Sequence, residues 1–125
     1  MKNLVTLFKA LSDGNRLRIL AALSLSEELC ACQITELIKV TGATISRHLS
    51  LLQRADLVES RKDGRWVYYR IKATNAEMAS IIQSALFPIL KEDNSLKEDR
   101  ERLNRITEIE AELLCQRQRG KECCH

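Results

Sequence analysis

The chain has 125 residues, of which 45% are apolar and 4% aromatic, and a formal net charge of +3, which predicts one domain with a modest aliphatic core. No run of about 18 apolar residues occurs, and the first five residues enter a helical pattern without a cleavage signal, so neither a membrane span nor a signal peptide is predicted. We therefore expect a cytoplasmic protein.

The first two elements are predicted to be short helices. Leu4, Phe8 and Leu11 form one apolar stripe, and Asp13 is a plausible N-cap for the helix that follows. Ile19, Leu20 and Leu23 are expected to face inward from this second helix.

Between Gln33 and Arg54 two amphipathic helical patterns follow one another, separated by Val40-Thr41-Gly42. Their apolar stripes are Ile34, Leu37 and Ile38, then Ile45, Leu49 and Leu52. A short connection with a glycine suits two helices that cross steeply, as in a helix-turn-helix, whose second helix enters the major groove of double-stranded DNA. The candidates for contact with DNA on this second helix are Thr44, Ser46, Arg47, Ser50 and His48. Because His48 lies ~60° from the apolar stripe, a structural hydrogen bond and a base contact are both open for it.

A β-hairpin is predicted next. Residues 58–62 and 65–71 alternate with period two, and Asp63-Gly64 between them is a strong hairpin signal because both residues tolerate positive φ. Its tip carries Arg61, Lys62 and Arg65, which suit a phosphate backbone or a minor groove. From Lys39 to Lys72 the chain has eight Lys or Arg and three Asp or Glu, a net +5 that leaves −2 for the rest. The pattern predicts a mainly α fold with a small β-hairpin, a winged helix-turn-helix that binds DNA.

The remaining chain is predicted to be helical. An apolar stretch from Met78 to Leu90 contains Pro88, which should end or kink its helix near Phe87. From Ser95 a further helix is indicated by Leu96, Leu103, Ile106, Ile109 and Leu113. We expect residues 1–93 to form the DNA-binding and dimerisation domain, and 94–125 a helical extension with a Cys-rich tail.

The chain resembles the ArsR/SmtB family of metalloregulatory repressors. The likeness rests on five segments in this order: Ala10-Leu11-Ser12-Asp13, Arg16-Leu17-Arg18-Ile19-Leu20, Ser46-Arg47-His48-Leu49, Ala55-Asp56-Leu57-Val58 and Asp63-Gly64-Arg65-Trp66-Val67-Tyr68-Tyr69. It implies a homodimeric repressor that leaves its operator DNA when a metal or metalloid binds. Gly42 and Asp56 depart from the Gln and Gly that the family often has there. In this family the terminal helices form the dimer interface, for which the candidates are Leu4, Phe8, Ile82 and Phe87; packing within one chain is the other explanation for these residues.

Cys30-Ala31-Cys32 is the candidate sensor motif. Residues i and i+2 of a regular helix point apart, so two thiolates reach one ion only at a first turn that can unwind. A helix N-terminus also favours the thiolate. Glu28-Leu29-Cys30-Ala31-Cys32 looks like the Glu-Leu-Cys-x-Cys motif of the arsenic- and antimony-sensing members, which cadmium and lead sensors share.

The third ligand and the ion stay open. Thr35 stands where many arsenic sensors have a third cysteine, and the candidates for the third ligand are Cys115, Cys123 and Cys124. A two-thiolate site completed by water or by an organic group on the arsenic is the other alternative. Sulfur ligands favour As(III) or Sb(III) as the inducer, with Cd, Pb or Hg as alternatives. Thiols that sense oxidation are another hypothesis. The odd number of cysteines argues against a disulfide framework, and no Cys-x-x-Cys or phosphate-binding loop indicates an enzyme.

Overall fold

The computed structural model describes residues 2–73 and 77–108. Its helices are α1 (Lys2–Leu11), α2 (Gly14–Leu25), α3 (Ala31–Ile38), α4 (Gly42–Arg54), α5 (Glu77–Glu92) and α6 (Lys97–Thr107), with a 3₁₀ turn η1 (Asn94–Leu96) before α6. Its strands are β1 (Leu29–Cys30), β2 (Val58–Asp63) and β3 (Trp66–Ile71). None of the helices within these ranges has the length and apolar character that crossing a membrane requires.

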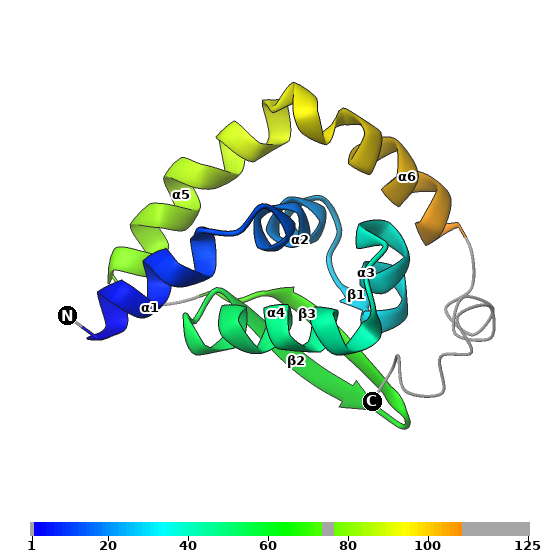
Figure 1. Ribbon diagram of the computed structural model, residues 1–125, viewed down its shortest axis with the longest axis horizontal. Coiled ribbons are helices and arrows are strands. Elements are labelled where there is room, and N and C mark those ends of the chain that lie inside the picture. The colour runs from blue at the N-terminus through cyan, green and yellow to red at the C-terminus, as the bar shows by residue number, and fades with distance from the viewer. Residues whose placement is uncertain (1, 74–76, 109–125) are drawn as a thin grey trace.

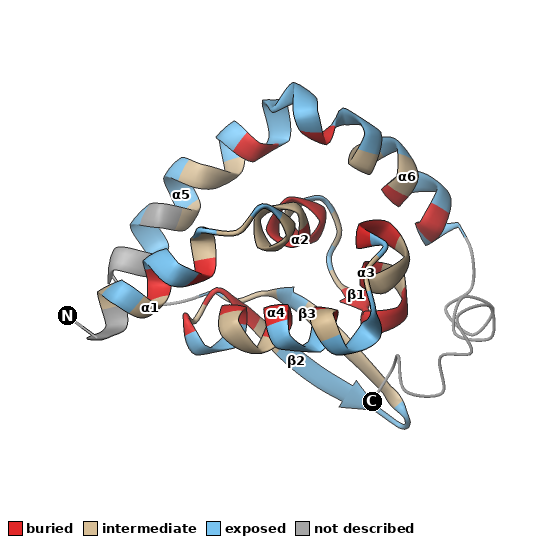
Figure 2. Ribbon diagram, viewed as in Figure 1, coloured by how far each residue is buried: buried red, intermediate tan, exposed pale blue. Residues whose placement is uncertain are grey.

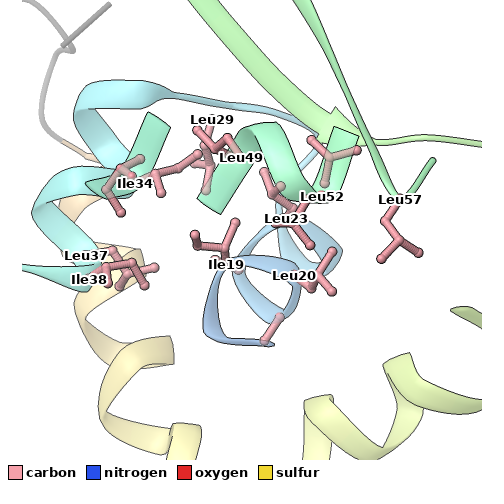
Figure 3. Close-up of a cluster of buried hydrophobic side chains, with 14 of the residues drawn as sticks. Ile19, Leu20, Leu23, Leu29, Ile34, Leu37, Ile38, Leu49, Leu52 and Leu57 are labelled. Carbon is pink, nitrogen blue, oxygen red and sulfur yellow. The ribbon is translucent and has the colours of Figure 1, made fainter. Parts of the chain in front are cut away.

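Helix α2 is the centre of the molecule. Figure 1 shows α5 and α6 arching over one side of α2, with α3, α4 and the hairpin on the other side. Most of the fully buried side chains come from α2, α3, α4 and the strands, among them Ile19, Ile34 and Leu49, and Leu57 joins them from the connection between α4 and β2. They meet in one cluster (Figure 3). The predicted winged helix-turn-helix is confirmed by this arrangement of α3, α4 and the β2–β3 wing.

The wing contains one strand more than the predicted hairpin. The strands lie in the order β1-β3-β2, and both neighbours of β3 run antiparallel to it. Strand β1 is only Leu29–Cys30, paired with Tyr69 and Tyr68. A strand of two residues leaves no alternation to detect, so the sequence pattern did not predict it.

Two local predictions about turns were wrong in detail. In the hairpin Asp63 pairs with Trp66, so the turn residues are Gly64 and Arg65 rather than Asp63 and Gly64. Only Gly64, at φ 62°, has a positive φ there. In the helix-turn-helix the connection is residues 39–41 rather than Val40-Thr41-Gly42, and it begins with Lys39, which caps the end of α3 at φ 63°. Gly42 is instead the first residue of α4.

Helices α1, α5 and α6 differ in how far they match the sequence predictions. The buried residues of α1 are Leu7 and Ala10, whereas Phe8 of the predicted stripe is 52% exposed. Helix α5 continues through Pro88 to Glu92, so the proline does not end it. The extension is helical from Lys97 to Thr107, and its predicted apolar residues Leu96, Leu103 and Ile106 are buried; Ile109 and Leu113 lie outside the described residues.

Candidate DNA-binding surface and metal site

The N-terminal end of α4 is capped and open to solvent. Thr41 is the N-cap, and its Oγ1 accepts a hydrogen bond from the Thr44 backbone N–H at 3.2 Å. The Thr44 and Thr41 hydroxyls lie 2.8 Å apart, so Thr44 also supports the cap. Ser46 and Arg47 are exposed, whereas Thr44 and Ser50 are half-buried. Figure 2 shows exposed positions along this outer side of α4 and along the wing.

His48 has a structural role. Its side chain is buried, at 7% exposure, and its Nδ1 lies 3.1 Å from Nη1 of Arg16. Since arginine has no acceptor, Arg16 donates and the imidazole Nδ1 accepts, which requires neutral His48. Burial lowers the pKa of His48, and the nearby Arg16 and Arg47 lower it further against the effect of Asp13. Of the two roles that the sequence left open for His48, the structural hydrogen bond is therefore the one that this geometry favours.

The wing carries the predicted cations, and Arg61 among them is paired with the carboxylate of Glu28. Arg61, Lys62 and Arg65 are all exposed. Arg61 donates from Nε to Oε2 of Glu28 at 2.9 Å and from Nη2 to Oε1 of the same carboxylate. This bond with Arg61 lowers the pKa of Glu28. The Arg65 guanidinium lies 5.7 Å from the centroid of the Trp66 ring.

The two candidate ligands lie at the start of α3, as the sequence predicted. Cys30 ends β1 and is the N-cap of α3, and Cys32 is in its first turn. Both are fully buried. The backbone N–H of Cys30 donates to Oε1 of Gln33 at 2.9 Å, so a glutamine side chain closes this helix end. Cys30 is a free cysteine, whereas Cys32 is disulfide-bonded, so Cys32 offers a thiolate only after that disulfide is reduced.

The donor set fits a soft ion only in part. Within residues 2–73 and 77–108, no group of three His, Cys, Asp or Glu side chains is placed to hold a metal ion. Two sulfurs at one first turn are the chemistry that a thiophilic ion requires, and a further ligand must come from elsewhere. Cys115, Cys123 and Cys124 lie outside the described residues.

The four candidates for the dimer interface differ in exposure. Phe8 is 52% exposed, whereas Leu4 and Phe87 are half-buried and Phe87 packs against the core. The side chain of Ile82 lies outside those that the structure describes.

Sequence reasoning missed three residues that build these sites. Glu28 was noted only as part of the cysteine motif, and neither Gln33 nor Arg16 was assigned a role. The partner of Arg61 lies 33 positions away, and that of His48 lies 32 positions away. Separations of this size leave no local periodicity, although Gln at the third position of a helix is a known capping signal.

Comparison with known proteins identifies the family. The model for "bacterial regulatory protein, arsR family" matches residues 13–60, which run from Asp13 at the N-cap of α2 into β2. The arsenical resistance operon repressor of Staphylococcus aureus is 41% identical over 83 residues, which cover 66% of this chain and 77% of that protein. The chain belongs to the arsR family. This is a family of regulatory proteins rather than of enzymes.

Two further similarities bear on this arsR-family protein. The cadmium resistance transcriptional regulatory protein CadC of Listeria innocua is 51% identical over 65 residues, 52% of this chain and 55% of CadC. The chain thus spans about half the length of that relative. The crystal structure of NolR from Sinorhizobium fredii matches with a TM-score of 0.58 and 25% identity over 74% of this chain and 88% of NolR.

Proposed function

We propose that this arsR-family protein is a homodimeric transcriptional repressor that binds operator DNA through α4 and the wing. We further propose that As(III) or Sb(III), bound by the thiolates of Cys30 and Cys32, releases it from the operator. The observation that carries the proposal is the position of both cysteines at the first turn of α3. Helix α3 packs on α4, so a change in that turn reaches the helix that reads the groove.

The support for DNA binding is the exposed, basic face formed by α4 and the wing. Ser46 and Arg47 are exposed there, and Thr44 lies at the capped N-terminal end that a recognition helix presents to the groove. Lys62 and Arg65 extend this face to the wing tip, where phosphate contacts make the affinity fall with salt.

Cadmium is the second candidate inducer. The relatives are named for both arsenical and cadmium resistance, and two sulfurs with one further ligand suit either ion. Ligands from the tail, namely Cys115, Cys123 and Cys124, would complete the site in one chain or across the dimer. A truncation after Leu114 removes all three and tests this part separately, because a normal response of the truncated chain would exclude tail ligands.

The deciding experiment is a titration of the reduced protein on its own upstream DNA, followed by fluorescence anisotropy, with arsenite, cadmium and zinc in parallel. Release of the DNA by near-stoichiometric arsenite or cadmium, but not by zinc, supports the proposal, and the ion that releases it is the inducer. Cys30→Ser should keep operator binding and lose the response, whereas Arg47→Ala should weaken binding without any ion. Operator binding that ignores every ion but is lost with peroxide would replace the proposal with an oxidation sensor.

A further inference from the structure

One ion pair joins the segment before the cysteines to the wing. Arg61 of β2 binds both carboxylate oxygens of Glu28, and its guanidinium lies 4.6 Å from the centroid of the Tyr68 ring. A bidentate arginine–carboxylate pair fixes orientation as well as charge, and stacking on an aromatic ring restricts the guanidinium further. Arg61 is therefore held in one place although its side chain is 46% exposed.

The strand register brings the same residues to the candidate metal site. Cys30 pairs with Tyr68 across β1 and β3, and Tyr68 pairs with Arg61 across β3 and β2. Cys30, Tyr68 and Arg61 thus form one row across the sheet, and directly opposed residues share a face. Glu28 lies two residues before Cys30, and its carboxylate binds Arg61, so the segment before β1 is joined to β2.

We infer that Glu28 is a positioning residue for the wing: through Arg61 it links the conformation of the cysteine segment to the fit of the wing on DNA. This inference rests on the proposed function and deepens it. Bringing the Cys30 and Cys32 sulfurs onto one ion changes the backbone at the end of β1, and Glu28 is only two residues from Cys30. A shifted Glu28 no longer holds Arg61 over Tyr68, so the wing loses the position in which it meets the operator.

The size of the effect is bounded by the pair itself. A link transmits no more than the difference in its free energy between the two states. Solvent screens an exposed ion pair, so its loss should reduce the coupling about two- to five-fold rather than abolish it. The contact between α3 and α4 provides the rest.

The test compares full-length Glu28→Gln, Arg61→Gln and the double variant with the wild type. The quantity measured is the coupling ratio, which is the operator Kd with saturating arsenite or cadmium divided by the Kd without it. Glu59→Gln is the matched control, because Glu59 pairs with Arg70 at 3.4 Å on β2 and β3 without reaching β1. The inducer bound per chain is measured in each variant by elemental analysis.

We expect both single variants to lower the coupling ratio about two- to five-fold, with the double variant no lower than either single one. Inducer binding should stay at the wild-type stoichiometry, and Glu59→Gln should keep the wild-type ratio. A wild-type ratio in Glu28→Gln, or an equal loss in Glu59→Gln, would overturn the inference. Additive effects of the two single variants would also overturn it, because they would act independently.

A second measurement needs no metal and separates this inference from the proposed function. If operator and inducer favour different conformations of the cysteine segment, operator DNA should slow alkylation of the reduced thiols of Cys30 and Cys32, read by mass spectrometry on the tryptic peptide 19–39. In Glu28→Gln and Arg61→Gln this protection should fall about two-fold or more, and in Glu59→Gln it should not. If no ion releases the wild type, the proposed function fails while this measurement still decides the link. Unchanged protection in Glu28→Gln would refute the link.

Discussion

Arg16 joins three parts of the chain through one guanidinium. Its Nε donates to the Ala10 carbonyl at 2.7 Å and its Nη2 to the Lys9 carbonyl at 3.0 Å, which caps the end of α1. Its Nη1 donates to His48 in α4. Because α4 is the second helix of the helix-turn-helix, this contact fixes how that helix sits on the two helices before it.

The Arg16–His48 contact predicts a specific dependence of stability on pH. The pKa of His48 is lowered in the folded state, so below the ordinary value of about 6.5 the unfolded chain takes up the proton first. The contribution of His48 is fully present above about pH 6.5 and is lost as the pH falls from there to the lowered pKa. His48→Gln keeps an acceptor and does not titrate. Melting temperatures from pH 8 to 5 should therefore fall more steeply in the wild type, and parallel curves would contradict the role given to His48.

Two glycines should respond in opposite ways to the same substitution. Gly14 begins α2 with an ordinary helical backbone, and an added Cβ meets nothing within 4 Å. Gly14→Ala should raise the free energy of unfolding by about 0.4–1 kcal/mol by restricting the unfolded chain. At Gly64, where φ is +62°, alanine should lower it by about 1–2 kcal/mol. Urea denaturation of both variants checks the pair, and stabilisation by Gly64→Ala would contradict the backbone assignment of the turn.

At the scale of elements, α6 completes the core rather than extending away from it. Leu96, Leu103 and Ile106 are buried against the rest of the protein. Arg18 of α2 donates to both Asp99 oxygens at 2.6 and 2.9 Å, and Arg102 donates to the Leu37 carbonyl at 2.9 Å. Helix α6 therefore holds α2 and the C-terminal end of α3 together. The candidate metal site lies at the other end of α3.

This packing predicts a large cost for truncating Leu103. The side chain is 3% exposed, and Leu103→Ala should lower the free energy of unfolding by about 2–5 kcal/mol. Glu101→Ala on the exposed side of the same helix is the control and should change it by no more than about 0.5 kcal/mol. Both are measured by chemical denaturation. A change in Leu103→Ala as small as the control would show that α6 does not pack on the core in solution.

Sequence patterns located the elements, and tertiary contacts decided what their residues do. The stripes of α3 and α4 and the alternation of the wing have short periods, so they were predictable. Asp56 stands where the family often has Gly, and its left-handed backbone, at φ 59°, is one that Asp tolerates. By contrast, Glu28 and Arg61 meet across 33 residues and Arg18 and Asp99 across 81. Contacts between residues so far apart in the sequence depend on the whole fold. Neither the ion pair of Arg61 with Glu28 nor the packing of α6 on α2 could therefore be predicted.

At the scale of the whole molecule, several large apolar side chains remain on the surface. Val5 and Phe8 on α1 are 46% and 52% exposed, and Ile81 and Ile89 on α5 are 55% and 64% exposed. Exposed apolar residues on the terminal helices are typical of a surface that a partner covers. A second copy of this chain would place two recognition helices about one turn of DNA apart, ~34–36 Å, and would favour a pseudo-palindromic operator.

Phe8→Glu tests this dimer directly. A carboxylate in an apolar interface loses its hydration without gaining a partner, so the dimer dissociation constant should rise about ten-fold or more, roughly 1.4 kcal/mol.

Leu25→Glu is the matched control, because Leu25 is 45% exposed at the end of α2, outside the proposed interface. Sedimentation velocity over a range of concentrations measures the association, and circular dichroism confirms that both variants fold. The wild type and Leu25→Glu should sediment as dimers that bind the operator, whereas Phe8→Glu should dissociate and lose operator affinity in parallel. A Phe8→Glu variant as dimeric as the control would place the interface elsewhere.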